Sequence, residues 1–288
     1  MKTFYYLLLI GVVSLSCSRA QISVELQASQ DQFLPGEPIN IAARIVNKSG
    51  QTLALGADND WLTFSVESRE GFLVSELAKP SVAGEFELES SKAAIKKLDL
   101  QPSYNFGRPG RYLITADVKI KEWNRVFSSK ACQLDIVQGS KIWQQEFGVP
   151  VKGKESADVP EVRKYSLQQA NYLKRLKLYV QITDAAESRI IKVFSIGPMV
   201  SFSRPEAQLD KNSNLHILWQ TGASRFSYHE ISPDGDILKR QTHEYLMNSR
   251  PRLALDDKGE IIVRGGGRKV LADDIGPKEE SEVAKPAP

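Results

Sequence analysis

The residues of this chain whose side chains are best suited to metal binding or catalysis are its three histidines, His216, His229 and His243. His216 and His229 fall on adjacent predicted strands of one hairpin, which raises the question of a shared site. A zinc site, however, needs three or four ligands of defined spacing. No Cys pair and no HExxH motif accompanies these histidines. We therefore expect no metal site.

A second candidate is the polar run from Asp210 through Asn212 to Asn214, which is similar to the first half of a calcium loop. Such a loop requires glycine at its sixth position and glutamate at its twelfth. Here those positions hold Leu215 and Thr221. The run therefore predicts a polar hairpin turn.

Motifs for phosphate binding and nucleophilic catalysis are incomplete in the sequence. Gly265 to Gly267 follow a predicted strand, but no Lys-Ser/Thr pair and no long helix comes next. No Gly-x-Ser-x-Gly elbow places a serine for attack. Cys132 alternates with Leu134 and Ile136, which predicts a buried and inert thiol. We expect no catalytic, cofactor-binding or metal-ligating residue and no cofactor, while catalysis by residues that converge only in the fold stays open.

Three further residues have both a functional and a structural interpretation. Trp61 and Trp123 are suited to a ligand platform if they are exposed, but their positions favour core packing for Trp61 and hairpin closure for Trp123. Asn47-Lys48-Ser49 is formally a glycosylation sequon. It falls at a tight turn, whose geometry explains Asn47 and Gly50 without a glycan.

Alternation of apolar and polar residues predicts the elements of the first half. Period-two runs begin near Ile22, Ile39, Leu62 and Tyr112, and Val126 to Val137 is expected to form a last strand. Turn residues separate these runs. Seven or more short strands of this kind predict a sandwich of two antiparallel sheets.

The turn-and-strand pattern of residues 21–138 resembles immunoglobulin-like modules of bacteria. The resemblance is carried by Pro35-Gly36-Glu37-Pro38-Ile39, Asn47-Lys48-Ser49-Gly50 and Pro109-Gly110-Arg111-Tyr112. The pattern is also similar to domains of the intracellular proteinase-inhibitor type and of the fibronectin type III kind. The Cys and Trp arrangement of antibody domains is missing. The resemblance implies an architecture rather than a partner.

A near-repeat organises the second half. The segment Ser203-Arg204-Pro205 recurs as Ser249-Arg250-Pro251, 46 positions later. A period in this range is typical of blade-like β-repeats. Val162 to Leu176 also fits an amphipathic helix, but the alignment of Lys164 to Gln169 with Leu215 to Gln220 favours strands.

The repeat predicts two four-stranded units and a fragment between residues 162 and 268. Ser232-Pro233-Asp234-Gly235 and Asp256-Asp257-Lys258-Gly259 have the composition of hairpin turns. Propellers need at least four blades, so this chain cannot close one alone. Three arrangements stay open: a small twisted stack of sheets, an edge packed on the first domain, or pairing with another copy through the strand edges.

The combination of the two halves resembles uncharacterised secreted bacterial proteins, in which an immunoglobulin-like domain precedes a short propeller-like repeat. The segments Ser203-Arg204-Pro205-Glu206 and Ser249-Arg250-Pro251-Arg252 carry this resemblance. It implies an all-β fold and leaves the activity open.

The amino-terminal residues predict export. Lys2, the apolar run Phe4 to Val13 and the end Ser18-Arg19-Ala20 form a signal peptide over residues 1–20, with cleavage before Gln21. Ten apolar residues are too few to cross a bilayer core of about 30 Å as a helix. Lipidation of Cys17 is the alternative, but Ser14 and Leu15 depart from the lipoprotein box. We expect a periplasmic or extracellular protein without a transmembrane segment in the mature chain.

The net charge and the lengths of the segments indicate the partners and the domain organisation. The net charge of +3 falls to about +1 without the signal peptide, so nucleic acid is not an expected partner. We expect a sandwich over 21–138, a linker over 139–161, the repeat domain over 162–268 and a disordered tail over 269–288. This organisation favours a non-catalytic exported binding or structural protein that contacts a protein or a glycan. The alternative is a hydrolase, or a hydrolase-accessory or inhibitor-like protein, whose site forms only in the fold.

Overall fold

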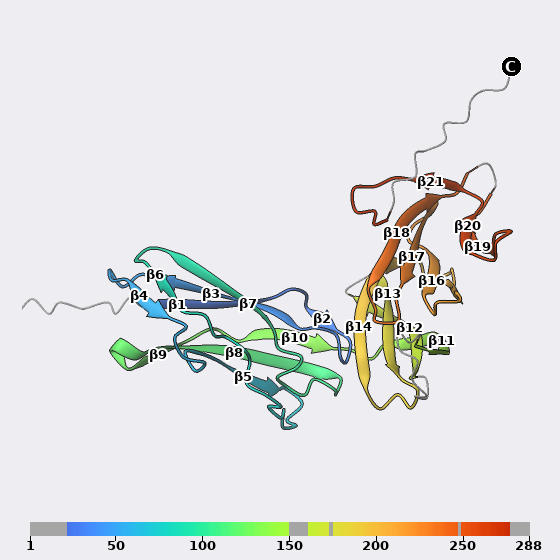
Figure 1. Cartoon of the computed structure of the whole chain (residues 1–288). Coiled ribbons are helices and arrows are strands. Elements are labelled where there is room, and N and C mark those ends of the chain that lie inside the picture. Colours follow the sequence, from blue (N-terminus) through green and yellow to red (C-terminus); the bar gives the residue numbers. More distant parts are fainter. Residues whose placement is uncertain (1–21, 150–160, 173–174, 247–248, 277–288) are drawn as a thin grey trace, which may run out of the picture.

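The computed structural model describes residues 22–149, 161–172, 175–246 and 249–276. The predicted signal peptide, Cys17 and the cleavage site lie outside these residues, as do 150–160 and 277–288 of the predicted linker and tail. The described chain confirms the all-β prediction, and its one helical turn is the 3-10 helix η1 (Lys121–Trp123). Two lobes follow one another along a bent axis (Figure 1).

Ten strands form the first lobe, and alternating burial along them makes its core. The strands are β1 (Ile22–Ala28), β2 (Gln32–Phe33), β3 (Asn40–Asn47), β4 (Leu53–Leu55), β5 (Leu62–Ser68), β6 (Phe86–Leu88), β7 (Ala93–Asp99), β8 (Gly110–Ile120), β9 (Arg125–Ser128) and β10 (Cys132–Ile136). One sheet has the order β1-β3-β7, and the facing sheet has the order β2-β10-β8-β5, with β9 paired to β8 and with β4 and β6 forming a separate pair.

The topology of the first lobe has two features typical of immunoglobulin-like sandwiches. Strand β2 follows β1 of the first sheet but belongs to the facing sheet, where it pairs in parallel with β10, the last strand of the lobe. At the start of β8, the Tyr112 hydroxyl donates a 2.7 Å hydrogen bond to the carbonyl of Arg108, four residues upstream. This contact is a tyrosine corner, which fixes the loop that enters the strand.

The second lobe consists of stacked layers of strands. The strands are β11 (Ser140–Gly148), β12 (Val162–Tyr172), β13 (Arg175–Asp184), β14 (Ile190–Met199), β15 (Glu206–Leu209), β16 (Leu215–Gln220), β17 (Arg225–Ile231), β18 (Ile237–Glu244), β19 (Arg252–Leu255), β20 (Ile261–Arg264) and β21 (Gly267–Lys269). The first layer has the order β11-β12-β13-β14, the second β15-β16-β17-β18-β21, and the third is the pair β19-β20.

Apolar side chains join the three layers. Leu167 and Val180 of the first layer pack with Ile217 and Trp219 of the second. On the other face of the second layer, Tyr228 and its neighbours pack against the β19-β20 hairpin. The strand preference for Val162 to Leu176 is confirmed, since β12 occupies most of it. The propeller-like character of the repeat is not confirmed, and the described layers form an open stack.

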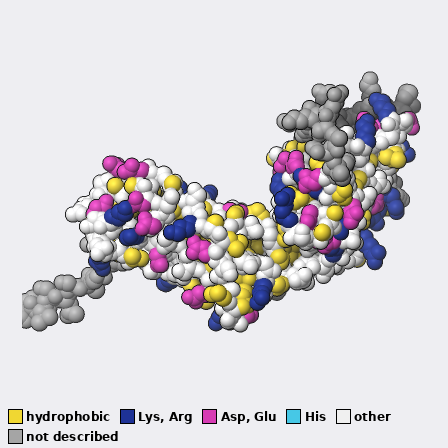
Figure 2. All heavy atoms as spheres, turned by 60° about the horizontal axis from the view of Figure 1, so that its bottom comes forward, with side chains coloured by type: hydrophobic (Ala, Val, Ile, Leu, Met, Phe, Trp, Pro, Cys, Tyr) yellow, Lys and Arg dark blue, Asp and Glu magenta, His cyan; other side chains and the backbone are white. Residues whose placement is uncertain are grey.

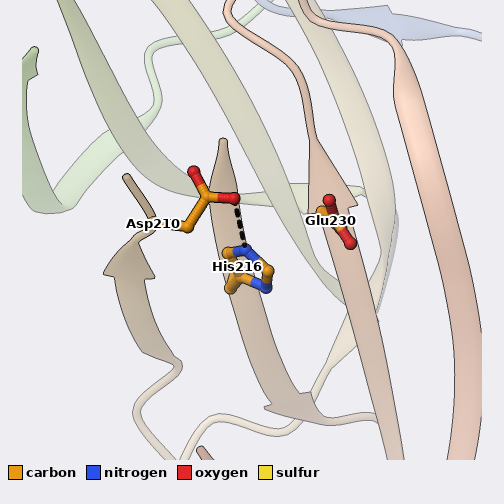
Figure 3. A group of neighbouring side chains, drawn as sticks. All are labelled: Asp210, His216 and Glu230. Atoms are coloured by element: carbon orange, nitrogen blue, oxygen red, sulfur yellow. Dashed lines mark ion pairs between the residues drawn. The ribbon is translucent and has the colours of Figure 1, made fainter. Parts of the chain in front are cut away.

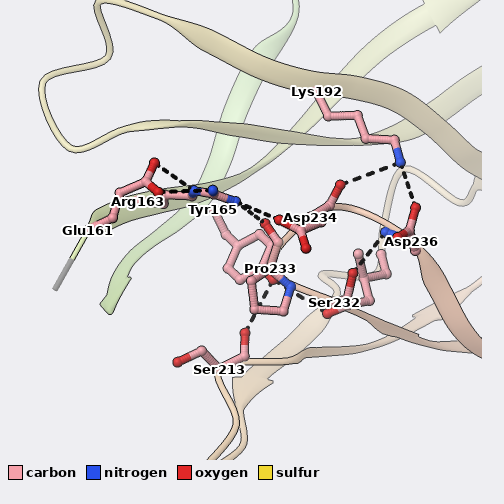
Figure 4. Close-up of polar contacts among 10 residues, drawn as sticks. Glu161, Arg163, Tyr165, Lys192, Ser213, Ser232, Pro233, Asp234 and Asp236 are labelled. Atoms are coloured by element: carbon pink, nitrogen blue, oxygen red, sulfur yellow. Dashed lines mark hydrogen bonds and ion pairs between the residues drawn. The ribbon is translucent and has the colours of Figure 1, made fainter. Parts of the chain in front are cut away.

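Polar contacts align the first two layers at the β17–β18 turn (Figure 4). Arg163 of β12 donates 3.0 Å hydrogen bonds to the carbonyl of Pro233 and to the Asp234 carboxylate. Lys192 of β14 reaches the Asp236 carboxylate at 3.0 Å. The turn itself has the predicted geometry, because Gly235 adopts a φ of 80° and donates to the carbonyl of Ser232.

An apolar contact joins the two lobes. Leu34 and Val137 of the first lobe pack with Ala170, Tyr179 and Val193 on the outer face of the first layer. Leu34 and Tyr179 are each 1% exposed. The first layer is therefore covered on both faces, by the first lobe on one side and by the second layer on the other.

Two predicted boundaries were wrong. Residues 140–148 of the expected linker form β11, because Phe147 is buried there and stacks on Tyr165 at 4.1 Å between ring centroids. Residues 269–276 of the expected tail are held on the second layer, where Lys269 ends β21 and Ile275 pairs with Arg240. Strands β6 and β7 were not anticipated, because their alternation is interrupted by charged and exposed residues.

The surface carries both signs of charge. On the face shown in Figure 2, acidic and basic side chains intermix over both lobes. The described residues include no helix long and apolar enough to span a membrane.

Candidate functional site

A cavity of about 550 Å³ opens in the second lobe, beside the segment that connects β14 to β15. The start of β11, one residue of β12, the last residue of β14 and this connection supply its walls. The lining residues are Lys141, Ile142, Trp143, Gln169, Met199, Ser201, Ser203, Arg204 and Pro205.

A β-bulge explains how β11 contributes three consecutive residues to the cavity. The pairing of β11 with β12 shifts register between Lys141 and Trp143. In a regular strand, neighbouring side chains point to opposite faces, and a bulge redirects one of them. Strand β11 is also an edge strand of its layer, so the bulge disturbs only one ladder.

Arg204 gives the cavity a cation that no described residue neutralises. Its side chain is exposed, and within the described chain it makes no hydrogen bond or ion pair. Lys141, by contrast, is paired with Glu187 at 2.8 Å. None of the lining residues is acidic. The cavity therefore combines an indole ring, neutral polar groups and a free guanidinium.

The two arginines of the repeat occupy equivalent positions but make different contacts. Each precedes the first strand of a layer, as the repeat predicted. Arg250 donates a 3.0 Å hydrogen bond to the Ser203 hydroxyl and lies 5.2 Å from the ring centre of Phe226. The repeated segment suggests a structural role for both arginines, with nearby backbone carbonyls or an acid of the adjoining unit as partners, but Arg250 instead contacts a hydroxyl and an aromatic ring. Arg204 instead lines the cavity.

A polar cluster lies at the other end of β15, outside the cavity (Figure 3). Asp210 Oδ2 is 3.5 Å from His216 Nε2. His216 Nδ1 is 2.7 Å from the Tyr228 hydroxyl. Glu230 pairs with His216 across β16 and β17, so its carboxylate lies on the same face. No pattern in the sequence points to Glu230, because only the register of β16 and β17 brings it beside His216.

The run Asp210 to Asn214 forms the predicted hairpin turn between β15 and β16. The Asp210 carboxylate accepts hydrogen bonds from the backbone N–H groups of Asn212 and Asn214, at 2.9 and 2.8 Å. Ser213 adopts a φ of 61° and donates its backbone N–H to the Asp210 carbonyl.

The three histidines do not share a site. His229 lies opposite Ile217 in the ladder and packs against Trp219, on the face that His216 does not use. Burial, together with Arg240, lowers the pKa of His229 to about 3. Burial and the charge of Arg268 lower the pKa of His243 to about 4. Both histidines are thus neutral at ordinary pH.

The glycine run after β20 has a structural explanation. Gly265 and Gly266 have φ angles of 80° and 64°. A Cβ atom on Gly265 would lie 2.7 Å from the carbonyl oxygen of Arg250, and one on Gly266 would lie 2.5 Å from that of Glu244. Gly266 donates its N–H to the Ser249 hydroxyl. The run lets the chain pass close to the repeated Ser-Arg-Pro segment.

The remaining candidates of the first lobe also have structural roles. Trp61 is 3% exposed and donates to the Val82 carbonyl at 3.0 Å, as core packing predicted. Trp123 stands in the η1 turn between β8 and β9, where it packs on Phe127. Cys132 is half-buried rather than buried, and desolvation raises the pKa of its thiol.

Asn47 is fully buried, and its amide nitrogen donates to the carbonyls of Gln51 and Leu88 at 2.7 and 2.8 Å. These two bonds occupy the nitrogen that a glycan would need. The turn interpretation of the sequon therefore agrees with the structure.

A second polar hollow, of about 400 Å³, lies in the first lobe around Arg111. Unlike the cavity at Arg204, it has two acidic lining residues and no indole ring: Arg111 pairs with Asp135 at 2.9 Å, and its backbone N–H donates to Glu70 at 2.9 Å. We therefore regard the cavity at Arg204 as the better candidate for binding.

The architecture defines the chain as an all-β protein with a two-sheet sandwich and a stack of smaller sheets. No protein-family model and no curated protein matches the chain. Among solved structures, the sporulation control protein Spo0M from Bacillus subtilis is similar over 62% of this chain and 91% of its own length, with 9% sequence identity and a TM-score of 0.31. A likeness at this level carries no argument about fold or function.

Proposed function

We propose that this chain is a non-catalytic exported binding protein of the cell envelope or the extracellular space, and that its ligand occupies the cavity at Arg204. The unpaired guanidinium of Arg204 is the observation that carries the proposal. Charged groups at a protein surface are often satisfied by water, but this one lines a cavity together with the Trp143 indole and the Ser201 and Gln169 side chains. Such a combination suits a ligand with a flat apolar face and an anionic group.

A glycan that carries carboxylates fits this description best. The faces of sugar rings pack on indole rings, and the carboxylate of a uronic acid is a natural partner for a guanidinium. Hydrolysis of such a glycan would need a pair of carboxyl groups flanking the bond. The lining of the cavity offers none among the described residues, which supports binding over hydrolysis.

Titration calorimetry with polygalacturonate and with a neutral glucan tests this proposal. We expect polygalacturonate to bind and the neutral glucan to bind more weakly. Arg204→Ala should weaken binding by about 10- to 100-fold, since a hydrogen bond to a charged group contributes about 1.5–3 kcal/mol. Trp143→Ala should weaken binding of both polymers.

Arg125→Ala is the matched control, because Arg125 is an exposed arginine on β9 of the first lobe, whereas the cavity lies in the second lobe. It should leave binding unchanged. Equal binding by Arg204→Ala and the wild type would contradict the proposal, as would a failure of both polymers to bind. Recovery of a protein ligand that depends on Arg204 would retain the site and replace the glycan.

Export is the second part of the proposal, supported by the run from Lys2 to Ala20. Sequencing the amino terminus of the protein from its own cells tests it. We expect the mature chain to begin at Gln21. A chain that begins at lipid-bearing Cys17 would establish a lipoprotein, and an intact Met1 would exclude export by this route.

A further inference from the structure

We propose that Asp210, His216 and Glu230 form a binding site for a divalent transition-metal cation, with Zn²⁺ as the best fit. The candidate ligand atoms of these residues lie within 4.8 Å of one another. One imidazole and two carboxylates are a ligand set that suits Zn²⁺, and Mn²⁺ less well. The site is independent of the cavity at Arg204, which lies at the opposite end of β15.

The state of His216 is the observation that points to a cation. Its side chain is 6% exposed, and Nε2 is buried without a hydrogen-bond partner among the described residues. The nearest charged atom is Asp210 Oδ2, at 3.5 Å. This separation exceeds the usual N–H···O range of about 2.7–3.2 Å. A buried imidazole nitrogen that faces a carboxylate without bonding to it can share a metal ion with that carboxylate.

The geometry agrees with a shared metal. Two ligand atoms at about 2.0–2.2 Å from a tetrahedral zinc ion are about 3.4 Å apart. The 3.5 Å between His216 Nε2 and Asp210 Oδ2 matches this separation. Asp210 and Glu230 are only half-buried, so the site is open to solvent on the carboxylate side. A water molecule would supply the fourth ligand.

The surroundings already orient each ligand. His216 Nδ1 lies 2.7 Å from the Tyr228 hydroxyl, a contact that can fix the ring with its Nε2 lone pair toward the carboxylates. The amide of Asn214 donates to Asp210 Oδ2 at 3.0 Å and to Glu230 Oε1 at 3.4 Å. A single side chain thus holds both carboxylates toward the histidine, as outer-shell residues do in metal sites.

Titration of the metal-free protein with ZnCl₂ tests the proposal. We expect one Zn²⁺ per chain with micromolar or tighter affinity, weaker binding of Mn²⁺ and no comparable binding of Ca²⁺. Glu230→Gln and His216→Gln should each weaken Zn²⁺ binding by at least tenfold. Co²⁺ added in place of Zn²⁺ should give the visible absorption of a tetrahedral complex, and His216→Gln should abolish it.

Asp257→Asn is the control, because Asp257 is an exposed acid at the β19–β20 turn. It should bind Zn²⁺ as the wild type does, and so should Arg204→Ala. If His216→Gln does not fold, Glu230→Gln still decides, because Glu230 is half-buried and, among the described residues, its carboxylate accepts a hydrogen bond from the Asn214 side chain alone. Failure of the wild type to bind Zn²⁺ below 100-micromolar concentration, or wild-type affinity in Glu230→Gln, would overturn the proposal.

Discussion

At the scale of single residues, the repeat shows how one residue type at equivalent positions acquires two roles. Arg250 lies between a hydroxyl and an aromatic ring of the preceding layer, whereas Arg204 has neither. The sequence predicts the position of both arginines, because the Ser-Arg-Pro segment is local. It does not predict their partners, because Ser203 and Phe226 reach Arg250 only through the stacking of layers.

We expect Arg250→Ala to lower the free energy of unfolding by about 1–3 kcal/mol, through loss of the charged hydrogen bond and the cation–π contact. Arg204→Ala should change it by less than about 0.5 kcal/mol, as is usual for exposed residues. Urea unfolding of the two variants measures the difference. Equal effects of the two substitutions would show that the contacts of Arg250 do not stabilise the stack.

The buried histidines predict a pH dependence of stability. His229 and His243 have pKa values lowered from 6.5 to about 3 and about 4 in the fold. Because the unfolded chain binds these protons first, the stability is complete above about pH 6.5 and falls as the pH decreases toward the folded values. The loss can reach about 1.4 kcal/mol per pH unit for each histidine.

Urea unfolding between pH 7 and pH 4.5 checks this expectation, since most carboxylates stay ionised over that range. His229→Gln, which does not titrate, should reduce the slope of stability against pH. If the variant has the wild-type slope, the pKa of His229 does not differ between the folded and unfolded states, which would contradict the expectation.

At the scale of elements, alternation predicted the central strands and missed those whose outer residues are charged. Strands β3, β5 and β8 have apolar residues on one face throughout, and each lies where the sequence predicts it. Strand β7 is exposed along one side and contains adjacent lysines, so its pattern resembles that of a loop. Strand β11 has the sequence pattern of a linker because it is an edge strand with a bulge and few buried residues.

The register of β3 can be tested with two neighbouring substitutions. Ile41 is 1% exposed, and Asn40 is exposed at the same end of the strand. Ile41→Asp places an unpaired carboxylate in the core, at a cost of several kcal/mol, and we expect it to unfold the first lobe. Asn40→Asp should be mild. Thermal melts followed by circular dichroism compare the two, and equal melting temperatures would contradict this register.

The candidate sites show the same limit of sequence reasoning. The Asp210 turn is local and follows from its composition, whereas the approach of Glu230 to His216 depends on how β16 and β17 pair. The sequence pointed to His216 and His229 as neighbours, and the ladder places them on opposite faces. The cavity at Arg204 combines residues from both ends of the first layer, which no local pattern reveals.

At the scale of the whole molecule, the apolar contact around Leu34 couples the lobes. Leu34 belongs to the cluster between the lobes and not to the core of the sandwich. Leu34→Ala should therefore weaken the coupling by about 2–5 kcal/mol, the usual cost of a large-to-small substitution at a buried site. The two lobes should then unfold in separate calorimetric transitions.

Leu62→Ala is the control for this experiment, because Leu62 is buried in the sandwich core. It should lower the stability of the first lobe while leaving the contact between the lobes intact, so the two separate transitions expected for Leu34→Ala should not appear. A single transition in Leu34→Ala, shifted as in Leu62→Ala, would show that Leu34 stabilises the sandwich rather than the contact between the lobes.

The described chain enters at one end of the long axis, where β1 begins, and leaves at the far end, beside β21 (Figure 1). The sandwich therefore separates the amino-terminal end of the described chain from the second lobe. If the amino end is tethered to a surface, the cavity at Arg204 is held a full lobe away from that surface. The length of the sandwich would then set the distance between the cavity and that surface. The cavity would bind a ligand on an opposing surface more readily than one on the surface that carries the tether.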